Sequence, residues 1–107
     1  MTWPLLRGQV VRADIGLDEP KLFVVVSNNR RNQHFPQVLC VRLTTSKKPS
    51  IPSIVQLGHP EAFTGRAVCD DIIEIYEKEV LAVVGGLSPT AMRAINTGLA
   101  AALGMSD

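Results

Sequence analysis

Short apolar runs of strand length recur along this chain, separated by polar segments that contain glycine or proline. Their length and their β-branched residues predict β-strands rather than helices. The polar and basic segment over residues 28–36 has room for a helical turn, and residues 80–84 suit either a short strand or a helical turn. The expected strands cover residues 9–15, 22–26, 38–45, 53–57 and 65–75.

A helical pattern covers the last part of the chain. Ser88 and Pro89 are typical of a helix N-terminus, and Gly104 is a natural C-terminal stop. Gly98 costs this helix about 1 kcal/mol relative to alanine unless close packing requires it. The apolar residues that repeat at helical spacing are Met92, Ile95, Leu99 and Leu103.

Short strands followed by one helix, without repeated strand–helix–strand units, predict a mainly β fold with a C-terminal α-helix. The expected architecture is a small barrel or a strongly bent antiparallel sheet. The hydrophobic content of 46% is ample for a globular core, and the chain has neither internal repeats nor a segment typical of a linker. We therefore expect one domain over residues 1–107.

Cysteine, histidine and leader patterns narrow the class of protein. Cys40 and Cys69 each lie in an apolar run, so buried free thiols are expected, although the two could face each other across adjacent strands. His34 and His59 are isolated, and without a histidine cluster or a CxxC motif a metal site has no support. The N-terminus lacks a basic leader and no apolar run reaches membrane-spanning length. A soluble, cytoplasmic protein is expected.

The strand over residues 38–45 ends in a cation and hydroxyl groups that strand stability does not require. Arg42 is followed by Thr44, Thr45 and Ser46, a sequence that suits an anionic, hydroxyl-rich ligand. RNA is the leading candidate for that ligand. The alternative is that Thr44 and Thr45 simply finish the strand, because threonine favours β structure.

Charge is distributed unevenly, although the net charge is only +1. That small total excludes nucleic-acid binding through bulk charge alone. As a group, Arg30, Arg31, Lys47 and Lys48 favour RNA contacts and predict salt-dependent binding, whereas each one alone could be a solvated loop charge. Aromatic platforms for base stacking are scarce; the candidates are Trp3, His34, Phe35 and Phe63.

Several short motifs, in this order, resemble the MazF/PemK toxins of toxin–antitoxin systems. They are Arg7–Val10, Phe23–Asn28, Leu43–Thr45, Gly65–Asp70 and Gly86–Pro89. The resemblance implies an SH3-like or CcdB-like barrel, usually a homodimer, that acts as a metal-independent endoribonuclease without a cofactor. Members cut single-stranded RNA at short preferred sequences and leave 2′,3′-cyclic phosphate and 5′-hydroxyl ends. A cognate antitoxin typically blocks the RNA groove with a disordered, acidic segment.

The resemblance also implies a catalytic pair. The family's Arg-Pro pair at the start of the second strand is matched by Lys21-Leu22, which keeps the positive charge but loses the planar fork of arginine. Lys21 as a plain exposed turn residue is the competing interpretation. The family's catalytic threonine or serine is matched by Thr44, with Thr45 and Ser46 as supporting donors.

Two arginines and an aspartate complete the expected site. Arg42 lies two positions before Thr44 and so shares its strand face, which makes it a candidate substitute for the arginine absent at position 21. Where some PemK-type members have another arginine this chain has Val68, and Arg66 is the nearest cation on that face. Asp70 is a candidate general base or cation-orienting group, or else it only pairs with a neighbouring cation.

Two other functions stay open at this point. A barrel that poisons a protein target, as CcdB toxins poison DNA gyrase, is less favoured because the ending Gly104–Asp107 lacks the Trp-Gly-Ile pattern of that group. A non-catalytic RNA-binding relative is the other alternative, motivated by Lys21 and Val68 where the family has arginine.

Overall fold

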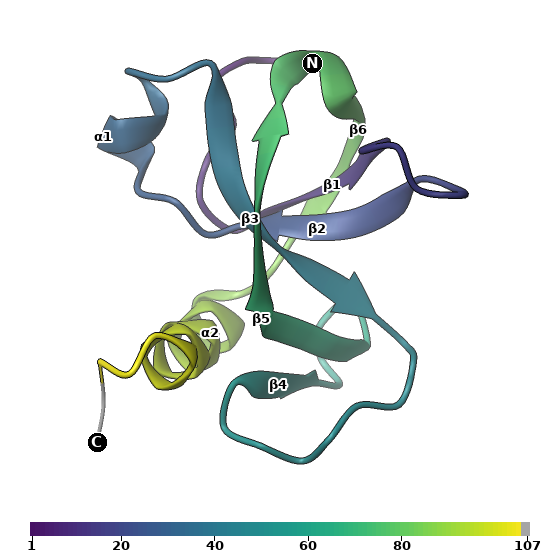
Figure 1. Cartoon of the computed structure of the whole chain (residues 1–107), viewed down its shortest axis with the longest axis vertical. Coiled ribbons are helices and arrows are strands. Elements are labelled where there is room, and N and C mark those ends of the chain that lie inside the picture. The colour runs from purple at the N-terminus through teal and green to yellow at the C-terminus, as the bar shows by residue number, and fades with distance from the viewer. Residues whose placement is uncertain (106–107) are drawn as a thin grey trace.

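The computed structural model describes residues 1–105, and one six-stranded antiparallel sheet dominates it (Figure 1). The order of the strands in the sheet is β4-β5-β3-β2-β1-β6. The mainly β fold of strongly bent antiparallel strands is therefore confirmed, but β4 and β6 are edges and hydrogen bonds do not close the sheet into a barrel. The strands are β1 (Gln9–Ala13), β2 (Lys21–Val25), β3 (Gln37–Thr44), β4 (Ile54–Leu57), β5 (Gly65–Tyr76) and β6 (Val80–Gly86).

The two ambiguous segments of the sequence are now resolved. Residues 80–84 belong to strand β6, so the helical alternative there is wrong. The polar connection does contain one helical turn, α1 (Asn29–Asn32), whose N-terminus is capped by the Asn28 side chain. A short 3₁₀ turn, η1 (Glu77–Glu79), joins β5 to β6.

A sharp bend in β5 gives the sheet its curvature, and Figure 1 shows the strand turning through it. Val41 of β3 pairs with Ile72, whereas the next residue, Arg42, pairs with Val68. Residues 69–71 therefore have no partner on β3, and such a bulge bends a strand. The bend separates the part of β5 next to β4 and the helix from the part that runs along the start of β3.

Apolar side chains on the two faces of the sheet form two core clusters. Alternation along β3 separates them, because Val41 and Leu43 belong to one cluster while Val38 and Cys40 belong to the other. The first cluster lies under the C-terminal helix, and the second contains Phe23.

The C-terminal helix α2 (Pro89–Ala102) packs on β4 and β5. Met92 and Ile95 are buried as expected, but Leu103 is 59% exposed and lies just past the helix, so it does not belong to the apolar face. A Cβ at Gly98 would approach Val55 Cγ2 to 2.7 Å and Cys69 Sγ to 2.8 Å. Close packing therefore accounts for this glycine.

Both cysteines are free and buried, as predicted. They pack in different clusters, so the idea that they face each other is not supported. Burial raises the pKa of Cys40 to about 12, and burial together with the charge of Asp70 raises that of Cys69 to about 11. In residues 1–105, no helix is long and apolar enough to cross a membrane.

Candidate active site

A cleft of about 500 Å³ opens where β2 begins and β3 ends. Its walls come from the loop before β2, the end of β3 with the loop that follows, and the loop between β4 and β5. The cleft brings together several residues that the sequence analysis singled out. Its lining residues are Glu19, Pro20, Lys21, Leu22, Arg42, Leu43, Thr44, Thr45, Ser46, Ala62, Phe63 and Thr64.

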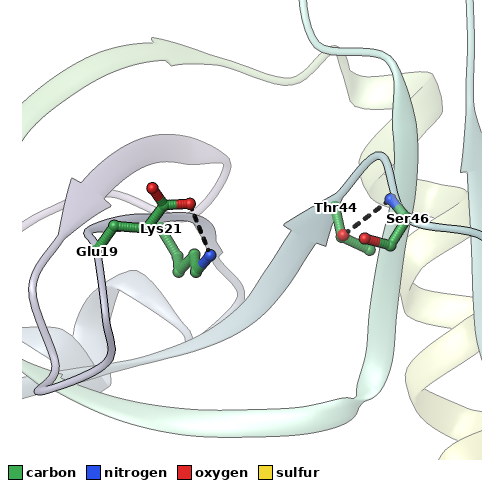
Figure 2. A network of polar contacts seen from close by, with 4 residues as sticks. All are labelled: Glu19, Lys21, Thr44 and Ser46. Atoms are coloured by element: carbon green, nitrogen blue, oxygen red, sulfur yellow. Dashed lines mark hydrogen bonds and ion pairs between the residues drawn. The ribbon is translucent and has the colours of Figure 1, made fainter.

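Thr44 is the last residue of β3 and is half-buried. Its Oγ1 accepts a hydrogen bond of 3.1 Å from the backbone N–H of Ser46, which is drawn in Figure 2. This local bond fixes the hydroxyl oxygen and leaves its proton free to donate to a ligand. Thr44 thus presents an oriented donor to the cleft.

Lys21 stands at the start of β2, on the other side of the cleft in Figure 2. Its Nζ forms an ion pair of 3.0 Å with the Glu19 carboxylate. The Lys21 side chain is 27% exposed and that of Glu19 is 72% exposed, and Lys21 is a strand residue that lines the cleft. Sequence analysis missed Glu19, because an acidic residue beside a proline in a turn has no distinguishing pattern.

Arg42 and Arg66 lie on the same face of the sheet as Thr44. Thr44 pairs with Arg66 across β3 and β5, and Arg42 pairs with Val68 two residues further along. Arg66 does not line the cleft; instead its NH1 donates to the carbonyl oxygens of Ser46 at 3.2 Å and Thr45 at 3.5 Å. It therefore holds the loop that carries the hydroxyl groups.

Neither guanidinium group forms an ion pair with a carboxylate of residues 1–105. Within residues 1–105 the one ion pair is that of Lys21 with Glu19. The Nε atoms of Arg42 and Arg66 are both buried, and neither has a hydrogen-bond partner among the described residues. An unpaired buried donor is costly. Of these two arginines, Arg42 is the one whose residue lines the cleft, where its guanidinium charge suits an anion.

Asp70 lies apart from this cleft. It is at the bend of β5, where its carboxylate accepts a hydrogen bond of 2.8 Å from the Ser53 hydroxyl, and it does not line the cleft. Val68, where some PemK-type members have arginine, is buried.

The basic residues divide between two places. Arg30 and Arg31 are on α1, next to the start of β3, whereas Thr44 is at its end. Arg31 also has structural partners, donating to the Gln37 carbonyl at 2.7 Å and lying 4.5 Å from the Phe35 ring centroid. Lys47 and Lys48 are exposed in the loop directly after the cleft residues. The lysine pair is thus next to the cleft and the arginine pair is at the other end of the strand.

Comparison with known proteins shows which family the chain resembles over almost its whole length. The family model described as "PemK-like, MazF-like toxin of type II toxin-antitoxin system" matches residues 6–103. Proteins named Endoribonuclease MazF4 of Mycobacterium tuberculosis and Endoribonuclease MazF1 of Mycobacterium bovis are each 42% identical over 100 residues, which is 94% of this chain and 93% of theirs.

Solved structures show the same fold. A mycobacterial endoribonuclease in complex with its cognate antitoxin has a TM-score of 0.88 at 41% identity, covering 96% of this chain and 98% of that one. MazF from Deinococcus radiodurans, at 16% identity, has a TM-score of 0.76 and covers 97% and 100% of the two chains, which supports the fold alone. From the match over residues 6–103 and the identity to curated relatives, the chain belongs to the PemK-like, MazF-like family of type II toxin–antitoxin toxins.

Proposed function

We propose that this toxin is an endoribonuclease that cleaves single-stranded RNA in the cleft between the start of β2 and the end of β3. The observation that carries the proposal is the Thr44 hydroxyl, oriented beside Arg42, a guanidinium without a carboxylate partner in the described chain. The names of the curated relatives support the same activity.

The proposed reaction is an in-line attack by a ribose 2′-hydroxyl on the adjacent phosphorus. The 2′-oxygen–phosphorus bond forms and the phosphorus–5′-oxygen bond breaks, which leaves a 2′,3′-cyclic phosphate and a 5′-hydroxyl. Thr44 donates a hydrogen bond to a non-bridging phosphate oxygen, while Lys21 and Arg42 stabilise the charge that develops there. Removing one such donor costs about 100- to 1,000-fold in rate.

Two proton transfers complete this reaction, and the cleft lining contains no histidine. Glu19 is the carboxylate in the cleft, so it accepts the proton of the 2′-hydroxyl, and Lys21 supplies a proton to the departing 5′-oxygen. Asp70 is less suited to the role of base because its carboxylate is bound to Ser53 outside the cleft lining. Positioning and fixed charges supply most of the acceleration in such a site.

The surroundings of the cleft suggest its partners. A basic cleft with exposed Lys47 and Lys48 beside it suits the phosphate backbone of RNA, and also an acidic segment of a cognate antitoxin. The solved complex of a mycobacterial relative with its antitoxin supports that partner. We further propose one domain over residues 1–107 that acts as a cytoplasmic homodimer, a state that sedimentation equilibrium measures directly.

The direct test is to incubate the purified protein with long single-stranded RNA in the presence of EDTA. We expect cuts at a short preferred sequence, with 2′,3′-cyclic phosphate and 5′-hydroxyl ends, and a rate that falls as salt is added. RNA that stays intact across varied sequences would contradict the proposal, and cleavage abolished by EDTA would contradict its metal independence.

One observation supports a second candidate function. Lys21 replaces the family's arginine and is ion-paired with Glu19, which reduces its effective charge. A non-catalytic RNA-binding protein would bind RNA without cutting it, and Thr44→Ala would then leave its effect in cells unchanged. The gyrase alternative depends on the ending Gly104–Asp107, whose last two residues lie outside the described part of the chain.

A further inference from the structure

The loop between β4 and β5 supplies the apolar wall of the cleft. Phe63 is the aromatic residue among those that line it, and it is half-buried against the first core cluster. Other parts of the lining carry the Thr44 hydroxyl and the cations Lys21 and Arg42. The cleft thus combines a ring with groups that suit a phosphate, the two chemistries that one nucleotide presents.

Glu61 fixes this loop to the start of helix α2. Its carboxylate accepts two hydrogen bonds from Ser88, one from the backbone N–H at 2.9 Å and one from the hydroxyl. The backbone N–H of Glu61 also donates to the Gly58 carbonyl at 2.9 Å. A carboxylate held through both oxygens restrains its own loop strongly, and Phe63 is only two residues away.

Strand β6 contacts the Phe63 ring at Gly85. A Cβ placed on Gly85 would lie 2.9 Å from Phe63 Cε2 and 3.0 Å from its Cζ, so one edge of the ring rests on the glycine backbone. With one edge against β6 and its loop held by Glu61, the ring has a fixed position while part of it remains exposed.

We propose that Phe63 is a stacking platform for one RNA base beside the scissile phosphate, and that Glu61 is the positioning residue that holds the platform. The inference rests on the proposed ribonuclease function, because it assigns the base-contacting wall of the same cleft. A ring used only to fill the core would need no exposed part in the cleft and would tolerate any apolar side chain of similar size.

Stacking is measured with short RNAs that carry 2-aminopurine at successive positions around the mapped cleavage site. A 2′-O-methyl group on the attacking nucleotide prevents cleavage, and stacking quenches 2-aminopurine fluorescence. We expect quenching at one position with the wild type and with Phe63→Tyr, and its loss with Phe63→Leu. With cleavable RNA, Phe63→Leu should raise KM by roughly 5- to 150-fold with little change in kcat.

The control is Tyr76→Leu, which removes an aromatic ring at the end of β5, outside the cleft, where Tyr76 is 39% exposed. It should leave both quenching and KM unchanged. Circular dichroism checks the fold of each variant, and Phe63→Met, which keeps more of the side-chain volume, replaces Phe63→Leu if that protein unfolds. Equal quenching by wild type and a folded non-aromatic Phe63 variant would overturn the proposal.

The positioning role is tested separately with Glu61→Gln, which keeps the shape of the side chain but weakens its bonds to Ser88. Partial loss of quenching at the same position, together with a raised KM, is expected. A lower melting temperature with full quenching would reduce Glu61 to a stabilising residue and overturn its role. If the wild type cuts no RNA, the ribonuclease function fails. In that case 2-aminopurine is placed at every position in turn of a short RNA that the protein binds, and absence of position-dependent quenching refutes stacking.

Discussion

Replacing Gly65 with alanine tests how the fold holds the end of β3. Gly65 is the first residue of β5, with a φ of 106°, and it lies against the backbone of Thr44. A Cβ there would be 2.4 Å from the Thr44 carbonyl oxygen and 3.1 Å from the carbonyl carbon. Since backbone cannot rotate away as a flexible side chain can, Thr44 itself must move.

Two free-energy costs set how much Gly65→Ala destabilises the protein. A side chain at this positive φ costs about 1–3 kcal/mol, and overpacking against a fixed neighbour costs about 1–3 kcal/mol more. Together they predict a loss of about 2–6 kcal/mol from a total stability that is typically about 5–15 kcal/mol. Displacing Thr44 by an ångström should also lower RNA cleavage by about 100-fold.

Urea denaturation followed by circular dichroism measures the loss of stability, and initial rates of RNA cleavage measure the effect on the site. Gly58→Ala is the matched control, because a Cβ there meets nothing within 4 Å. It should change stability by less than about 0.5 kcal/mol. A loss below about 1 kcal/mol for Gly65→Ala, with cleavage unchanged, would refute the reasoning.

Three further predictions concern charges and thiols. The hydrogen bonds from Ser88 lower the pKa of Glu61 from its ordinary value. Its contribution to stability is therefore complete above that ordinary value and is lost as the pH falls through the lowered folded pKa. Glu61→Gln should weaken the loss of stability toward acid pH in urea denaturation, and an unchanged pH dependence would contradict this. Cys40 and Cys69, whose pKa values are raised, should react with iodoacetamide only after unfolding, so rapid native labelling seen by mass spectrometry would be contrary evidence. Lys21→Ala should slow RNA cleavage by about 100-fold or more, whereas Lys21→Arg, which keeps the charge but does not release a proton, should retain only part of the wild-type rate. Cleavage by Lys21→Ala at the wild-type rate would remove Lys21 from the site.

Much of the fold could be predicted because its elements carry strong local signals. The apolar run of β2 and the capped, periodic helix α2 are examples. Strand β6 was ambiguous because residues 80–84 are all apolar, so the sequence shows no alternation of apolar and polar positions, although Leu81, Val83 and Val84 are at least 37% exposed in the structure. The bend at residues 69–71 depends on the register between β3 and β5, which no local pattern encodes.

The candidate site, like the fold, could be predicted only in part from the sequence. Lys21, Arg42 and Thr44 could be assigned from a family resemblance and strand alternation, and the structure brings all three to one cleft. The position of Glu19 in the cleft and the anchoring of Phe63 could not be predicted from the sequence, because both depend on loops that meet only in the folded chain. Sequence alone identified Phe63 as one aromatic platform among several without separating it from Phe35.

The claim that Thr44 and its cleft perform RNA cleavage is tested most directly by comparing initial rates of the wild type, Thr44→Ala and Thr45→Ala on one mapped RNA substrate in EDTA. Thr45 is exposed and its hydroxyl has no role in the proposed chemistry beyond support. We predict a fall of about 100- to 1,000-fold for Thr44→Ala and a much smaller change for Thr45→Ala, with both variants folded. Cleavage by Thr44→Ala at the wild-type rate would contradict the account.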